Sequence, residues 1–218
     1  MTHLLKRLAA GLLFVAVVMA RPALSRDILD MGVPSFDIRD APMLLAVQQL
    51  RDLGVRVCFE EIEIDPSRDR FLNETNDVMI RKVKFSLRLE KKSVREILDA
   101  LVRIDSEYLW RLDAESGVVN ILPGPPAGSV LTWSVDNLDV EREGRLTVLQ
   151  DTLHLKARKI TLFWRGSYDV YNAAISLHIS NVPIIDAINK ISSVPPSLCW
   201  TLAGFKGGRI LTFVPCGF

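Results

Sequence analysis

The chain has 218 residues, of which 49% are hydrophobic and 24% are charged, and its 27 Lys and Arg residues nearly balance its 26 Asp and Glu residues. A chain of this length can bury one sizeable core or two small ones. Because the charges balance, the composition excludes a protein that is drawn to nucleic acid or to anionic lipid by its net charge.

The first 25 residues have the pattern of a secretory signal peptide. Lys6 and Arg7 give a positively charged start, and the apolar run 8–20 follows. This run is shorter than the roughly 20 residues that cross a bilayer, so an uncleaved membrane anchor is the weaker alternative. We expect cleavage after residue 20 or 25 and export to the periplasm, with no stable membrane insertion of the mature chain.

One pattern occurs twice, at a distance of 90 positions. Phe85–Leu89 and Trp110 correspond to Ile175–Ile179 and Trp200, and each pair encloses a similar apolar helical stripe. Repeats of a solenoid are only roughly 20–50 residues long, so this period indicates two copies of one small domain. A duplicated scaffold without a duplicated reactive residue favours binding over catalysis.

In the first copy, apolar residues alternate in the expected strands and follow helical spacing in the expected helices. Asp40 is the candidate N-cap of the first helix, and Ser93 with Glu96 forms a capping box at the start of the second. The polar stretch 60–80 fits neither pattern and is predicted to be a long loop. The expected order is a strand at 35–38, a helix that ends at Gly54, a strand at 55–59, the loop, a strand at 83–89, a helix at 94–104 and a hairpin at 108–122.

The second copy follows a linker rich in Pro and Gly at 124–129. The sequence therefore predicts an α+β fold with two small repeated domains, 33–123 and 130–218, after the signal peptide 1–25. Each domain is expected to be roughly βαββα plus a β-hairpin. In the second domain these elements are a strand at 131–135, a helix around 146–153, strands at 159–164 and 175–179, a helix at 184–191 and a hairpin at 198–214.

The chain has three cysteines, an odd number in a compartment where disulfides persist. The dipeptide 207–208 is Gly-Gly, which suits a two-residue hairpin turn, and folding about it places Cys199 opposite Cys216, close enough to be bridged. Pro215 counts against this register because it has no N–H to donate, so two free thiols remain the alternative. We expect a Cys199–Cys216 disulfide, with Cys58 left as a thiol.

The segments 36–42, 54–57, 83–89 and 93–101, followed by the Trp-bearing hairpin, resemble the short secretin and TonB N-terminal (STN) domain. The resemblance covers about 36–123 well and 133–215 less closely. The chain differs from the family pattern in two ways. Its stretch at 60–80 is longer, and no pore-forming or barrel region follows the two domains. It implies a small α+β module that docks envelope proteins such as a secretin or an outer-membrane transporter, with no catalytic residue.

Lys84, Arg88 and Lys92 are the candidate partner-binding residues. Basic residues alternate with apolar ones along the strand at 83–89, so this strand is expected to have a basic outer face. An exposed strand edge is a template for the strand of a partner. An ordinary solvated face is the alternative.

No pattern in the sequence predicts catalysis. The two histidines outside the signal, His154 and His178, lie in separate segments, and no metal-ligand spacing or phosphate loop occurs. We expect no catalytic residue, metal or cofactor, and predict a non-enzymatic periplasmic protein-interaction module. The alternative is a periplasmic protein that binds a small ligand in the cleft between the two domains, which would be lined by Trp133, Trp164, Tyr168 and Tyr171.

Overall fold

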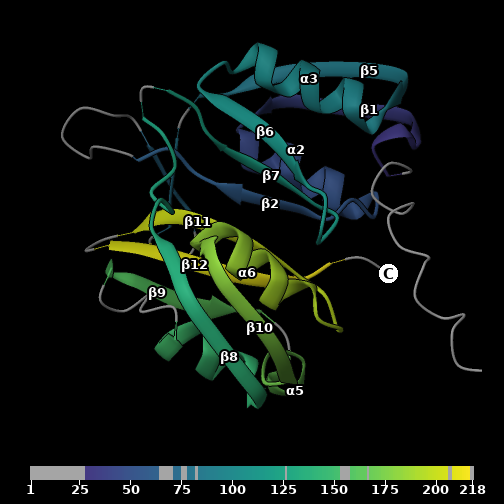
Figure 1. Ribbon diagram of the computed structural model, residues 1–218. Helices are drawn as coiled ribbons and strands as arrows, with labels where there is room; N and C mark the ends of the chain where they lie inside the picture. The colour runs from purple at the N-terminus through teal and green to yellow at the C-terminus, as the bar shows by residue number, and fades with distance from the viewer. Residues whose placement is uncertain are drawn as a thin grey trace, which may run out of the picture.

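The computed structural model describes residues 28–63, 71–74, 78–81, 83–125, 127–152, 158–165, 167–205 and 208–216. The fold is α+β, as predicted, and is drawn in Figure 1. The predicted signal peptide lies outside the described residues. Among those residues, no helix is long and apolar enough to cross a membrane.

The first half builds two sheets around two helices. β1 and β5 pair antiparallel, whereas β2 pairs parallel with β7, which pairs antiparallel with β6. Phe36 of β1, Leu50 of α2, Phe59 of β2 and Leu98 of α3 are fully buried in one core between the sheets. The elements are β1 (Gly32–Ala41), α2 (Met43–Asp52), β2 (Val57–Glu60), β3 (Phe71–Glu74), β4 (Val78–Arg81), β5 (Phe85–Ser93), α3 (Val94–Ile104), β6 (Tyr108–Asp113) and β7 (Val118–Pro123).

The second half repeats these pairings. β8 pairs antiparallel with β10, and β9 pairs parallel with β12, which pairs antiparallel with β11. Its core contains Leu138, Ile179, Ile188, Trp200 and Phe213. The elements are β8 (Ser134–Gly144), α4 (Arg145–Thr147), η1 (Val148–Thr152), β9 (Ile160–Trp164), α5 (Tyr168–Tyr171), β10 (Ala174–Pro183), α6 (Ile184–Ser193), β11 (Leu198–Phe205) and β12 (Gly208–Pro215).

The strand registers of the two halves correspond residue by residue. Two copies of one unit would produce this correspondence, because side chains on a strand alternate between faces and a register slip would exchange them. The corresponding pairs are Phe36–Leu89 with Leu138–Ile179, Trp110–Ile121 with Trp200–Phe213, and Cys58–Asn120 with Phe163–Thr212.

A bulge in the first strand of each half also corresponds. Asp40 and Arg142 have positive φ angles of 45° and 56°, and their N–H groups donate to the Oγ atoms of Ser86 and Ser176 at 3.0 and 2.9 Å. Asp40 is therefore part of the bulge. The prediction that it caps α2 was wrong. The residue before α2 is Pro42, which makes no side-chain cap.

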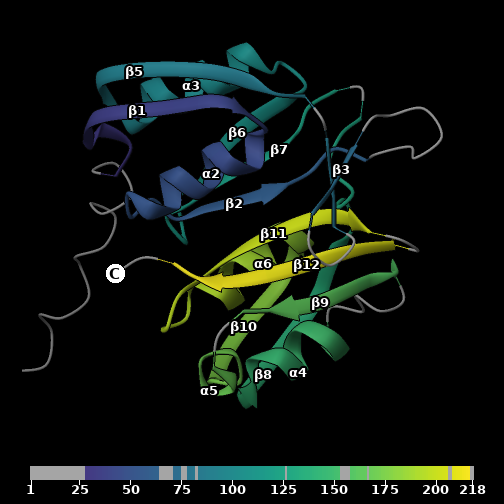
Figure 2. The same cartoon turned by 180° about the vertical axis from the view of Figure 1, so that it is seen from behind.

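The two halves share one sheet of eight strands. β11 pairs parallel with β2 and antiparallel with β4, which pairs with β3. α6 lies in front of this sheet in Figure 1, and α2 lies in front of it in the reverse view of Figure 2. The prediction of a loop at 60–80 holds at 61–63, which have no regular structure, and was wrong at 71–74 and 78–80, where the chain forms β3 and most of β4. The apolar run Val78-Met79-Ile80 is the part of the stretch that pairs with β11.

The predicted register of the final hairpin was wrong by two residues, since Trp200 pairs with Phe213 and Leu198 with Pro215. A shift of two leaves each side chain on its face, and both Trp200 and Phe213 are fully buried. The Cys199–Cys216 disulfide is present nevertheless, with 5.5 Å between the Cα atoms. Cys216 lies just beyond β12, where its N–H donates to the carbonyl of Ser197 at 3.1 Å. A disulfide is compatible with an extracytoplasmic location.

Candidate functional site

The edge of β2 is where the second half joins the first. Thr201 and Leu202 of β11 lie beside Phe59 and Glu60 of β2, and the N–H of Glu61 donates to the carbonyl of Leu202 at 2.7 Å. The intervening chain separates these strands by more than a hundred residues. The junction is therefore an example, within one molecule, of a strand added to an exposed sheet edge.

Arg51 at the end of α2 ties the junction from one side of the sheet. Its guanidinium donates to the carbonyls of Val57 and Trp200, both at 2.8 Å, and to the Oγ of Thr201 at 3.0 Å. The residue is only 7% exposed, and burial lowers the pKa of this guanidinium. Hydrogen bonds to carbonyls of both halves compensate the buried charge in part.

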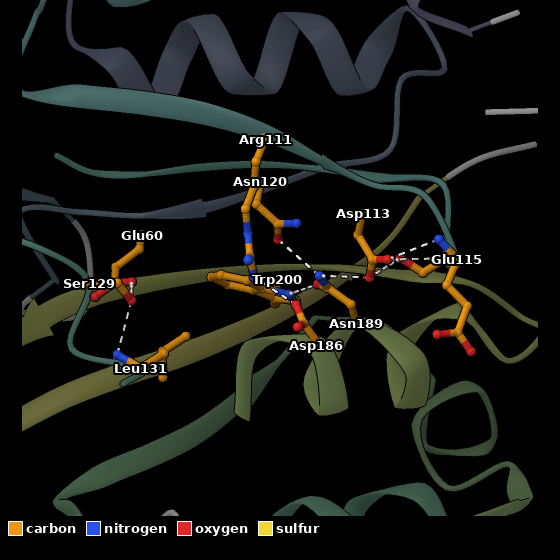
Figure 3. A network of polar contacts seen from close by, with 11 residues as sticks. Glu60, Arg111, Asp113, Glu115, Asn120, Ser129, Leu131, Asp186, Asn189 and Trp200 are labelled. Carbon is orange, nitrogen blue, oxygen red and sulfur yellow. Dashed lines mark hydrogen bonds and ion pairs between the residues drawn. The ribbon is translucent and has the colours of Figure 1, made fainter. Parts of the chain in front are cut away.

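Asn189 of α6 joins the halves on the other side of the sheet (Figure 3). Its Oδ1 accepts from the indole N–H of Trp200 at 2.9 Å, and its Nδ2 donates to Asn120 Oδ1 at 3.2 Å and to Asp113 Oδ2 at 3.3 Å. Asn189, Asn120 and Trp200 are all fully buried. Since buried polar groups are costly when unpaired, this network holds α6 on the first half in one arrangement.

Ion pairs surround this buried network. Arg111 pairs with Asp186 at 2.7 Å and Lys190 with Glu115 at 3.0 Å beside this network, and Arg209 pairs with Glu63 at 3.1 Å elsewhere between the halves. The first two pairs are partly exposed, so each contributes little free energy and mainly adds specificity to the contact.

β2 and β7 are buried on both faces as a result. Val57 and Phe59 belong to the first core, whereas Cys58, Val118 and Leu122 belong to the second. Cys58 therefore faces away from Val57 and Phe59. Burial raises the pKa of the Cys58 thiol to about 11, and its Sγ accepts from the N–H of Trp200 at 3.3 Å.

Glu60 fixes the far end of the predicted linker to the junction. Its carboxylate accepts from the Oγ of Ser129 at 2.5 Å and from the N–H of Val130 at 2.7 Å. The residue is fully buried, and burial raises the pKa of its carboxyl group.

The predicted partner-binding residues lie on β5 or, for Lys84, just before it, and each is paired with a carboxylate. The ammonium of Lys84 is 3.0 Å from Asp40, the guanidinium of Arg88 is 2.8 Å from Glu90, and the ammonium of Lys92 is 2.7 Å from Glu96. This surface therefore presents mixed charges and no basic patch. Its role in docking stays a prediction.

The four aromatic residues predicted to line a cleft between the halves do not come together there. Tyr171 is fully buried in the second half, where its hydroxyl donates to the carbonyls of Arg165 and Phe213. The ring of Trp164 packs 6.4 Å from that of Tyr171, and Trp133 lies under the guanidinium of Arg158. Tyr168 is 60% exposed on α5. Trp164 and Tyr171 therefore pack together within the second half, and a ligand cleft at these four residues stays a prediction.

The sequence did not single out the residues of the junction. A signal existed for two of them, because Asn120 interrupts the apolar run 118–122 and Asn189 lies beside the apolar stripe of α6. Nothing in the spacing of Arg51 distinguishes it from an exposed basic residue at the end of a helix.

Three strands at the ends of the large sheet have one partner each among the described residues. β9 pairs with β12 alone, β6 pairs with β7 alone, and the short β3 pairs with β4 alone. β9 has the sequence Ile-Thr-Leu-Phe-Trp, with Phe163 37% exposed. In the part of the chain that the structure describes, no group of His, Cys, Asp and Glu could hold a metal ion. No family model, curated protein or solved structure matches this chain.

Proposed function

We propose that this chain is a non-enzymatic protein-interaction module of the cell envelope, which docks a strand of its partner on the free edge of β9. The observation that carries the proposal is the uncharged, partly apolar character of this edge strand. Proteins protect edges that must stay free with charged residues, proline or bulges, and β9 has none of these between Ile160 and Trp164.

The long edge of β5 is a less suitable docking site. Its outward positions include Arg88 and Glu90, which neutralise each other and keep the strand hydrated. Such mixed charges are typical of edges that resist the addition of a strand.

The envelope location rests on two features. The signal-like pattern of residues 1–25 predicts export to the periplasm, and the Cys199–Cys216 disulfide suits an oxidising compartment. The resemblance to the STN domain implies an envelope protein as partner, such as a secretin or an outer-membrane transporter. The small-ligand alternative depended on a cleft between the halves, whereas Tyr171 is buried within the second half with Trp164 packed against it, so no observation favours it.

Affinity capture from an envelope extract tests this function with two variants. We expect Phe163→Lys to reduce the captured partner at least tenfold, because the new charge would be desolvated beneath an added strand. The triple variant Lys84→Glu, Arg88→Glu, Lys92→Glu, on the exposed face of β5, should capture as the unmodified chain does. Loss of capture in the triple variant alone would assign docking to β5 and refute the choice of β9.

Thermal unfolding of each variant serves as the control. Phe163 is outside the two cores, so Phe163→Lys should retain the unfolding temperature of the unmodified chain within a few degrees. The triple variant also loses the Lys92–Glu96 ion pair, so it should unfold at a lower temperature but still in one cooperative transition. Equal capture by all three proteins would contradict docking by strand addition at either edge.

A further inference from the structure

Two of the end strands of the large sheet, β9 and β6, are equivalents of the two strands that already join inside the molecule. By register, β9 corresponds to β2, and β6 corresponds to β11. The edge of β2 is covered by β11. The edge of β9 and the outer edge of β6 carry no strand in the described part of the chain.

The outer sheet face beside β9 is also equivalent to a face that is covered in the first half. Cys58, Val118 and Asn120 are fully buried beneath the second half, and Leu122 is 6% exposed. Their counterparts in the second half are more exposed, and Figure 2 looks onto the strands that carry them, with no helix in front. These counterparts are Phe163, Ile210, Thr212 and Val214.

The opposite end of the molecule presents the matching surface. The indole N–H of Trp110 on β6 donates to Asp99 on α3 at 2.9 Å, just as that of Trp200 on β11 donates to Asn189 on α6 at 2.9 Å. Trp200 is fully buried by the junction, whereas Trp110 stays half-buried. The α3–β6 surface therefore has the shape of the α6–β11 surface, without its cover.

We propose that copies of this chain join head to tail, with β6 of one copy added parallel to β9 of the next, as β11 is added to β2 within each copy. This proposal rests on the proposed function, because both require β9 to accept an added strand. It differs in that the added strand comes from a second copy of this chain. An interface between two different surfaces does not close on itself at two copies. Repetition of this interface gives a ring or an open row, in which the sheet continues from copy to copy.

This joint is weaker than the one within the chain. The internal junction has the added pairing of β4 with β11 and the Arg51 hydrogen bonds, and it acts at the high effective concentration of a connected chain. Association between copies is therefore expected to depend on protein concentration.

Sedimentation equilibrium of the chain purified after export tests the proposal. The weight-average mass of the unmodified chain should rise with concentration and pass that of a dimer. Phe163→Lys on β9 and Leu109→Lys on β6 should each give a monomer, because each charge falls where the equivalent residue, Cys58 or Cys199, is fully buried. An equimolar mixture of the two variants should form a dimer and nothing larger, since one intact end remains on each copy.

Leu45→Lys is the matched control, because Leu45 on α2 is 48% exposed and lies at neither end of the sheet. It should associate as the unmodified chain does. A mass that stays at the monomer at every concentration would overturn the proposal, and so would a dimer that persists in the Leu109→Lys variant.

The same measurements separate this inference from the proposed function. A chain that stays monomeric but captures an envelope protein through Phe163 would refute the second copy as partner and leave strand addition at β9 intact. A monomeric chain whose capture does not depend on Phe163 would refute both.

Discussion

Asn189 satisfies buried polar groups from both halves with a single amide. Its neighbours Trp200, Asn120 and Asp113 come from β11, β7 and β6, so the residue fixes α6 against the first half. The equivalent residue in the first half is Asp99, whose bond to Trp110 is partly exposed to water. The chain therefore contains one buried and one exposed version of the same contact.

We expect Asn189→Ala to lower the free energy of unfolding by about 2–3 kcal/mol, because it leaves buried polar groups without partners. Asp99→Ala is the matched control and should cost less than about 1 kcal/mol, since water replaces the lost acceptor. Urea unfolding of both variants measures the difference. Equal losses would contradict the assignment of Asn189 as a buried link between the halves.

Cys58 should be unreactive in the folded protein. It is fully buried, and the raised pKa of about 11 keeps the thiol protonated at neutral pH. We expect no alkylation of native protein by iodoacetamide at pH 7.5 over an hour, and one labelled thiol, at Cys58, after denaturation without reductant. Label on Cys199 or Cys216 under these conditions would contradict the disulfide.

The two long amphipathic helices α3 and α6 begin differently. Ser93 and Glu96 form the predicted capping box at α3, whereas α6 follows Pro183 without a side-chain cap. Bonds from Lys92 and Ser93, of which the one from Lys92 has the larger effect, lower the pKa of the Glu96 carboxyl group from 4.5 to about 2. The folded helix therefore favours the ionised form of the Glu96 carboxyl group.

A lowered pKa gives a stabilisation that is present above pH 4.5 and is lost as the pH falls from 4.5 toward 2. We expect Glu96→Gln to be less stable than the unmodified chain at pH 7 and to approach it in stability near pH 2. Unfolding temperatures across this range measure the effect. A constant difference at every pH would show that the charge of Glu96 is not its source.

The elements that were predicted well have a clear periodic pattern of apolar residues within their own segment. The apolar stripe of α3 is visible in Val94, Ile97, Leu98 and Leu101, which are all fully buried. β3 and β4 were missed because they are four-residue strands inside a polar stretch. β3 pairs with β4, and β4 pairs with β11, which is distant in the sequence. The hairpin register was missed because Gly207-Gly208 offers more than one turn, and pairing with β9 and β2 decides among them.

The candidate site could not be predicted for a related reason. Free and covered edges look alike in a sequence, since β2 and β9 are both short and apolar. What distinguishes them is the arrival of β11 at β2, a contact between segments far apart in the chain. The basic residues Lys84, Arg88 and Lys92 suggested a docking face instead. The carboxylate that pairs with Lys84, Asp40, is 44 residues away in the sequence, so this part of the charge balance is not visible in the local pattern.

At the scale of the whole molecule, the shared sheet predicts that the halves stay together when the linker is cut. The sequence predicts a domain boundary at 124–129. In the structure, the eight-stranded sheet, Arg51 and Asn189 all connect the residues before this boundary with those after it. We expect a chain cleaved between Gly124 and Gly128 to elute as one particle under native conditions and as two fragments in urea. Native separation of the fragments would show that the halves are independent domains.

The pairing of β2 with β11 also sets an order of events during synthesis, which proceeds from the N-terminus. Cys58 has no cover, and the edge of β2 has no neighbour from its own chain, until residues 201–202 emerge, when about nine-tenths of the chain already exists. The nascent first half therefore travels with an open edge, and the last strands to appear are the ones that close it.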